Sequence, residues 1–184
     1  MGKQHTYIFV DFDDTLCLHV KRLEQKKALF CDSSTAADYV YKDSILNQPL
    51  HDWLKDSKEH GASLILITEA SSMLLDAKKA WVLKNCDDLG FDYFISTSMD
   101  LDKADHLERF EGMHPDSKIL FVDDMGKERA AVSNRCRHVM VTSPQYIMSR
   151  QYSLMKSGGD NGVFECQKRP KRTKRKITLR RTRI

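Results

Sequence analysis

The sequence lacks any long hydrophobic run. Among its 184 residues, no stretch approaches the roughly 18 consecutive apolar residues that a membrane-spanning helix needs. Its polar N-terminal residues also lack the apolar core of a secretory signal peptide. We therefore expect a soluble protein with no membrane partner. Its expected location is the cytoplasm, with the nucleus as the alternative in a eukaryotic or viral host.

Cysteine is scarce and occurs only singly. There is no CxxC pair and no histidine at metal-ligand spacing from any cysteine, and the five positions are Cys17, Cys31, Cys86, Cys136 and Cys166. This pattern argues against a disulfide framework or a zinc site and predicts reduced, mostly structural thiols. Cys17 lies next to an acidic segment, so a redox-sensitive thiol stays open there, although free cysteine usually behaves as a small hydrophobic residue.

Acidic residues are absent from residues 168–183, which hold ten of the 30 lysines and arginines. The rest of the chain therefore has 20 basic residues against 26 acidic ones, and the net charge of +4 conceals a mildly acidic domain with a basic tail. A glycine-rich break over residues 158–162 separates the two. We predict one domain over residues 1–156 and a disordered basic tail over residues 157–184.

The basic tail has several open interpretations. Blocks of like charge bind nucleic acid, serve as nuclear import signals, contact proteins or simply solubilise the chain. Phe164 and Ile177 are too few for a base-stacking platform. Any nucleic-acid contact of residues 168–183 is therefore expected to reach phosphates and to be indifferent to sequence.

The chain is organised around residues 7–16, YIFVDFDDTL. Residues 7–10 are β-formers without alternation, which is typical of a central parallel strand covered on both faces. The strand stops at three carboxylates, Asp11, Asp13 and Asp14. In open α/β sheets the chemistry lies beyond the carboxyl ends of such strands, so this loop is where we expect a site.

Four more strand-like segments follow, each separated from the next by a helical pattern. We predict strands over residues 63–67, 93–96, 119–122 and 138–142, with helices over residues 47–60, 74–82, 100–110, 128–134 and 144–155. Five parallel strands alternating with helices predict an α/β protein with a Rossmann-like, doubly wound sheet.

Residues 17–46 are polar and lack strand-like runs, so they are predicted to form a small helical cover beside the acidic loop. We expect one helix over residues 21–27 and a second over residues 33–46. Asn47 is then predicted to cap the following helix, and Gly61 to close it.

The candidate site residues all fall at strand ends or at a helix start, on one predicted edge of the sheet. They are Asp11, Asp13, Thr68, Lys103, Asp123 and Asp124. Crowded carboxylates repel one another, so they favour a hard cation such as Mg²⁺ or stay partly protonated. Lys103 falls in the first turn of a helix, where a cation is unfavourable unless an anion lies nearby.

These residues resemble the four motifs of the haloacid dehalogenase superfamily. The motifs correspond to DFDDT at residues 11–15, LILIT ending at Thr68, Lys103, and FVDD ending at Asp124, and the resemblance covers about residues 7–142. It implies a Rossmann-like phosphatase domain with a Mg²⁺-dependent aspartyl-phosphate mechanism. The implied roles are nucleophile for Asp11, general acid and base for Asp13, phosphate anchors for Thr68 and Lys103, and metal binding for Asp11, the main-chain carbonyl of Asp13, Asp123 and Asp124.

Two departures from the family pattern bear on these roles. Glu69 follows Thr68 where the family often has a small or amide residue, and Lys118 rivals Lys103. Lys103 is preferred because Lys118 precedes its strand and should lie at the other end of the sheet. Carbon–halogen cleavage needs no acid two residues after the nucleophile, so Asp13 favours phosphoester hydrolysis over dehalogenation.

The substrate is less defined. Between Thr68 and Lys103 there is room for only one helix and one strand, so no large cap is expected and the site should admit bulky substrates such as a nucleic-acid end. A nucleotide or other small-molecule phosphatase, a phosphotransferase, a phosphoprotein phosphatase and a non-catalytic binding module on the same fold stay as alternatives. The non-catalytic binding module is disfavoured because every catalytic position that the resemblance implies holds the expected residue.

Overall fold

A computed structural model describes residues 4–20, 40–97 and 101–157 of the chain. Its centre is a five-stranded, all-parallel sheet with the strand order β5-β4-β1-β6-β7. The strands are β1 (Thr6–Val10), β4 (Ala62–Glu69), β5 (Tyr93–Thr97), β6 (Lys118–Val122) and β7 (Val139–Thr142). The predicted α/β class, the parallel pairing and the number of strands are confirmed.

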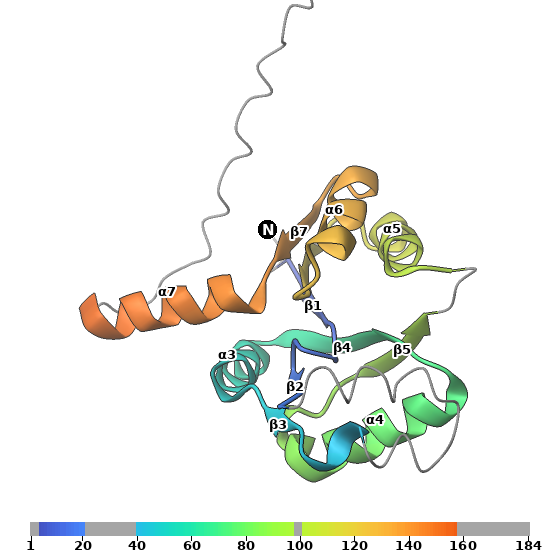
Figure 1. Cartoon of the computed structure of the whole chain (residues 1–184). Helices are drawn as coiled ribbons and strands as arrows, with labels where there is room; N and C mark the ends of the chain where they lie inside the picture. The colour runs from blue at the N-terminus through green and yellow to red at the C-terminus, as the bar shows by residue number, and fades with distance from the viewer. Residues whose placement is uncertain (1–3, 21–39, 98–100, 158–184) are drawn as a thin grey trace, which may run out of the picture.

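Helices cover both faces of this sheet (Figure 1). One face packs against α3 (Gln48–Glu59), α4 (Ser72–Asn85) and α7 (Pro144–Ser157), and the other against α5 (Lys103–Met113) and α6 (Gly126–Arg135). A short 3₁₀ helix, η1 (Asp87–Leu89), leads into β5. The sheet is therefore doubly wound, as predicted.

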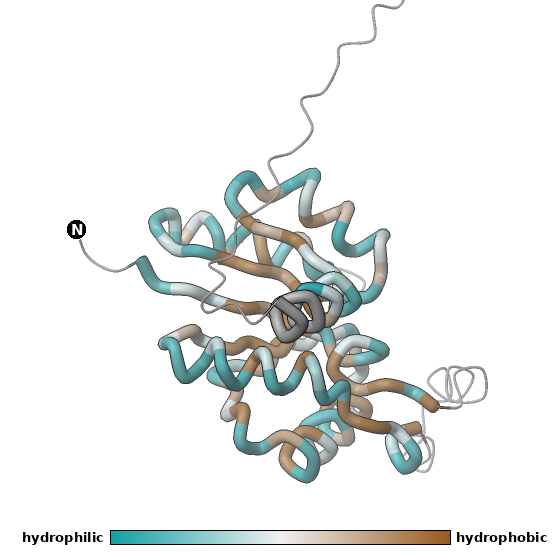
Figure 2. Tube along the Cα trace, turned by 90° about the vertical axis from the view of Figure 1, so that its left-hand side faces the viewer, coloured by the Kyte–Doolittle hydropathy of each residue, from teal (hydrophilic) through white to brown (hydrophobic). Residues whose placement is uncertain are grey.

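The two faces of β1 explain why its sequence does not alternate. Ile8 and Val10 pack into the core beneath α3 and α4, whereas Phe9 packs into the core beneath α5 and α6. All three are at most 2% exposed, so both faces of the strand demand apolar side chains. Figure 2 shows hydrophobic strand segments lying between more hydrophilic helical turns.

The segment after β1 differs from its prediction. Cys17–Leu18 forms β2 and pairs antiparallel with β3, Ile45–Leu46, so the predicted helix does not run to Leu46. Helical structure ends at Lys42. Two-residue strands are too short to leave a period in the sequence, which is why this antiparallel pair was missed. The predicted helix over residues 21–27 and the start of the second lie outside the described residues.

Two helix starts also differ from prediction in detail. Asn47 precedes α3 without a side-chain capping bond, and its Nδ2 donates instead to the Thr15 backbone oxygen at 2.8 Å. The helix predicted over residues 100–110 begins at Lys103, because Asp102 and Asp105 form a capping box there. Gly61, at φ +92°, ends α3 as predicted, since this backbone conformation suits glycine.

The remaining predictions concern the tail, membranes and thiols. The basic tail lies outside the described residues. No helix in the described ranges is long and apolar enough to cross a membrane. Cys17, Cys86 and Cys136 are free and buried. Burial raises the pKa of the Cys17 thiol, which favours the structural interpretation over a redox-sensitive one.

Candidate active site

Carboxylates from two neighbouring strands meet at the carboxyl end of the sheet. Asp11 directly follows β1 and Asp123 directly follows β6, and the Asp11 backbone N–H donates to the Val122 oxygen at 2.9 Å. Strand order reverses between β1 and β6, so this is the topological switch point where open α/β sheets bind ligands. Asp11, Asp123 and Asp124 each offer one oxygen, and the three oxygens lie within 4.8 Å of one another.

Lys103 lies between two of these carboxylates. Its Nζ donates to Asp11 Oδ1 and to Asp123 Oδ2, both at 2.7 Å, and its side chain is 8% exposed. Burial alone would lower the Lys103 pKa, but the two aspartates raise it above its ordinary value, so the ammonium stays charged. These anions explain why a lysine is placed at the start of α5.

The acidic cluster fits a hard divalent cation. Burial, with smaller contributions from the charges of Asp123 and Asp13, raises the pKa of Asp11 to about 7 against the opposing effect of the Lys103 ammonium. A cation bound to the three carboxylates would favour their ionised forms and relieve this repulsion. Mg²⁺ prefers oxygen ligands and is usually bound in proteins by one or two carboxylates together with waters and substrate phosphates.

Backbone and hydroxyl donors hold the acidic loops in place. Asp123 Oδ1 accepts from the Met125 backbone N–H at 2.7 Å, and the Asp124 backbone N–H donates to Thr15 Oγ1 at 3.0 Å. The second bond joins the loop after β1 to the loop after β6. Asp14 takes a left-handed conformation, φ +56°, which turns the first loop.

The Asp13 carboxylate lies outside this cluster and has a different set of partners. Its Oδ2 accepts from Lys78 Nζ at 2.6 Å, and its Oδ1 lies 3.0 Å from His19 Nε2 and 3.4 Å from the Tyr41 hydroxyl. Burial would raise the Asp13 pKa, but the hydrogen bonds from His19 and Lys78 prevail and lower it. Any contribution of Asp13 to metal binding would therefore come from its backbone carbonyl, as the family resemblance implies.

Lys78 is a site residue that the sequence interpretation missed. It lies on α4, its side chain is 1% exposed, and it also donates to Thr68 Oγ1 at 2.7 Å. An ammonium only donates, so Thr68 accepts here and keeps its own proton for a different acceptor. A signal was present: Leu74, Lys78 and Trp81 share the inner face of one helix by their spacing, and a lysine on an apolar face is unusual.

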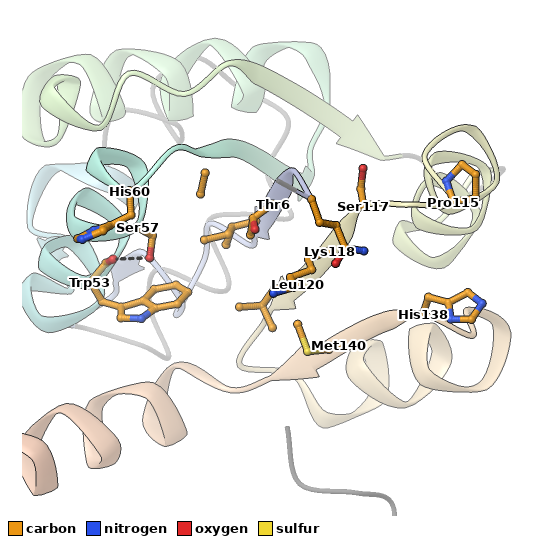
Figure 3. A pocket seen from close by; sticks show the side chains of 13 residues that line it. Thr6, Trp53, Ser57, His60, Pro115, Ser117, Lys118, Leu120, His138 and Met140 are labelled. Atoms are coloured by element: carbon orange, nitrogen blue, oxygen red, sulfur yellow. Dashed lines mark hydrogen bonds between the residues drawn. The ribbon is translucent and has the colours of Figure 1, made fainter. Parts of the chain in front are cut away.

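Lys118, the alternative to Lys103, lies at the amino-terminal end of the strands, opposite the acidic cluster. Lys118 is the first residue of β6 and lines a cavity of about 470 Å³ together with Thr6, Trp53 and Met140 (Figure 3). Asp123, by contrast, follows the last residue of the same strand. The structure thus brings Lys103, and not Lys118, to the acidic cluster.

No protein-family model matches the chain, and no curated protein matches its sequence. Solved structures are similar to it. One, from the Pnkp1/Rnl/Hen1 RNA repair complex, has a TM-score of 0.53 and 16% identity over 77% of this chain and 45% of that chain. Another is the N-terminal part of a Bacteroides fragilis protein containing a phosphatase domain, complexed with Mg. It has a TM-score of 0.53 and 16% identity, and the match covers 83% of this chain and 40% of that chain.

A third similar structure is a phospho-aspartyl intermediate analogue of phosphoserine phosphatase, with a TM-score of 0.50 and 12% identity over 84% of this chain and 99% of that chain. The chain spans less than half of the length of the first two proteins. Likeness at these identities concerns the fold. With the parallel strand order, it shows that the chain shares the α/β fold of these structures, which is the fold that the resemblance to the haloacid dehalogenase superfamily implies.

Proposed function

We propose that the protein is a Mg²⁺-dependent phosphoester hydrolase that acts through an aspartyl-phosphate intermediate on Asp11. One observation carries the proposal. Asp11 shares the Lys103 ammonium with Asp123 at 2.7 Å, and the cluster of Asp11, Asp123 and Asp124 offers three oxygens to a cation. A carboxylate attacks phosphorus only where the charge of the phosphoryl oxygens is neutralised. The Lys103 ammonium and a cation bound by the cluster would neutralise that charge.

In the first half-reaction, a carboxylate oxygen of Asp11 attacks phosphorus, and the bond to the leaving oxygen breaks. Asp13 donates its proton to that oxygen, and the alcohol departs. Lys103 and Thr68 would bind the phosphoryl oxygens through an ammonium and a hydroxyl. When bound by Asp11, Asp123 and Asp124, Mg²⁺ would supply charge neutralisation.

In the second half-reaction, the Asp13 carboxylate takes a proton from water while the water oxygen attacks phosphorus. The bond between phosphorus and Asp11 breaks, which releases inorganic phosphate and restores the Asp11 carboxylate. Asp13 ends this step protonated, as it began. Hydrogen bonds from Lys78 and His19 favour the ionised form of Asp13, which the second step needs, whereas the first step needs Asp13 to be protonated against this preference.

Metal dependence is the direct test of the proposal. We expect the protein to hydrolyse p-nitrophenyl phosphate with Mg²⁺ and to fall to background with EDTA, because the acidic cluster needs a hard cation. Mg²⁺ at about 100 times its Kd should also raise the Tm by about 5–10 °C. Initial rates and thermal melts measure both effects. Full activity in EDTA would remove metal from the mechanism.

We further propose a bulky, phosphate-rich substrate such as a nucleic-acid end. The ten basic residues of 168–183 support this choice, and one similar fold belongs to an RNA repair complex. A nucleoside monophosphate, a phosphorylated oligonucleotide and a phosphopeptide form the necessary panel. We expect the oligonucleotide to have the highest kcat/KM at low salt.

Truncation after Gly162 tests the contribution of the tail. We expect the KM for the oligonucleotide to rise, and the difference from the full chain to shrink as salt is added, because phosphate contacts release counterions. Hydrolysis of p-nitrophenyl phosphate serves as the internal control and should not change. An equal KM for both proteins at low salt would exclude nucleic acid as the partner of the tail.

A further inference from the structure

Lys78 contacts no reacting atom in the proposed reaction, yet its ammonium is buried beside the site. Its three protons have three acceptors, namely Asp13 Oδ2 at 2.6 Å, Thr68 Oγ1 at 2.7 Å and the Glu69 backbone oxygen at 2.8 Å. An ammonium has no further proton to donate. A direct bond from Lys78 to substrate would therefore break one of these three, so the residue acts through its partners.

The three acceptors come from two different strand ends. Thr68 and Glu69 are the last residues of β4, whereas Asp13 belongs to the loop after β1. We propose that Lys78 is a positioning residue, anchored at the end of β4 by Thr68 and Glu69, which holds the Asp13 carboxylate in place for proton transfer. This inference rests on the proposed hydrolase function.

The Asp13 carboxylate is held from two sides. Lys78 binds Oδ2, and Oδ1 lies within 3.4 Å of the Tyr41 hydroxyl and 3.0 Å from His19 Nε2. Both oxygens therefore have partners, which defines the plane of the carboxylate. Loss of Lys78 would remove the hydrogen bond to Asp13 Oδ2, while Oδ1 would keep its contacts with Tyr41 and His19.

A structural role alone accounts poorly for this lysine. Burying an ammonium costs free energy, and a buried ion pair is seldom more stable than apolar residues of similar volume. The Phe12 ring lies 5.5 Å from the Lys78 Nζ and offers its face, which offsets part of this cost. Methionine is close to lysine in length, so Lys78→Met should fit the slot and fold.

A double-mutant cycle tests the proposal. It uses Lys78→Met, Asp13→Asn and the double variant, with Lys84→Met, an exposed lysine of the same helix, as the matched control. We expect Lys78→Met to lower kcat for p-nitrophenyl phosphate by about 10²-fold, the usual cost of a misplaced group. The loss should be larger for an alkyl phosphate, whose leaving oxygen needs the proton more.

In the Asp13→Asn background, the same change should cost less than about 3-fold, because Lys78 then has no carboxylate to position. Lys84→Met should keep the activity of the unaltered protein. Wild-type kcat in Lys78→Met, or losses that multiply in the double variant, would overturn the proposal. Equal losses with aryl and alkyl phosphates would also overturn it, since they indicate a structural role.

Thermal melts of the same four variants separate this inference from the proposed function. Lys78→Met should lower the Tm by several degrees when Asp13 is present, and by much less in Asp13→Asn. If no variant and no unaltered protein hydrolyses any phosphate ester, the proposed function fails while this coupling still supports the placement of Asp13 by Lys78. Equal Tm shifts in both backgrounds overturn that placement whatever the activity.

Discussion

Asp11→Asn should fold normally and lose at least about 10⁴-fold in kcat for p-nitrophenyl phosphate. An amide oxygen is a poor nucleophile and forms no stable aspartyl phosphate, and loss of the nucleophile costs on the order of 10⁶-fold in a serine protease. Initial rates with Mg²⁺ measure the effect. Trapping of phosphorylated protein by acid quench should succeed with the unaltered chain and fail with the variant.

The metal-free variant should also melt at a higher temperature near pH 8. Burial raises the pKa of Asp11 to about 7 in the folded protein. A carboxyl with a raised pKa contributes stability below its unfolded value, and that stability is lost as the pH rises through about 7. Asparagine does not ionise and avoids this loss, so the advantage of the variant should vanish at pH 4.

Asp14→Asn is the matched control for Asp11→Asn. Asp14 lies in the same loop with φ +56°, a conformation that asparagine tolerates well, and it is outside the cluster of three carboxylates. It should retain most of the activity. Wild-type activity in Asp11→Asn, or equal losses in both variants, would show that Asp11 is not the nucleophile.

Asp13→Asn should reduce kcat by about 10²–10⁴-fold, the range typical of general acid and base catalysis. The variant should keep its affinity for Mg²⁺, because the Asp13 carboxylate faces Lys78 and His19 and lies outside the cluster of three carboxylates. Activity titrations with Mg²⁺ measure rate and affinity together.

The leaving group offers a second check on Asp13. Proton donation matters most for a poor leaving group, so the loss in Asp13→Asn should be greater for an alkyl phosphate than for an aryl phosphate. A loss of Mg²⁺ affinity as large as the loss of rate would make the Asp13 side chain a metal ligand. It would then contradict the division of roles between Asp11 and Asp13.

The sheet was predictable from the sequence because its signals are strong. Buried parallel strands read as uninterrupted apolar runs, and each of the five was identified to within about two residues. The strand order was not predicted, because the rule for right-handed crossovers fixes the hand of each connection and not the order of the strands. The antiparallel pair of β2 and β3 has two residues per strand, so its formation depends on tertiary contacts that no local sequence pattern reveals.

The candidate site was only partly predictable. Asp11, Asp123 and Asp124 follow apolar strands, so their meeting at one edge was foreseeable from topology. Lys103 was foreseeable from its unfavourable place at a helix start. The contribution of Lys78 to the site was not predicted. The residues that accept its three hydrogen bonds lie 9, 10 and 65 residues away along the chain, so no local pattern links them to it.

The position of β1 at the middle of the sheet has a consequence for biosynthesis. Thr6 pairs with Ala62 on one side and with Lys118 on the other, so the pairing of β1 is completed by a strand that emerges about 110 residues later. Pairing over such separations is slow and leaves apolar edges uncovered meanwhile. The nascent chain thus carries Asp11 without Asp123 until about 110 further residues are made, and a cation bound by both carboxylates can stabilise the fold only once β6 has left the ribosome.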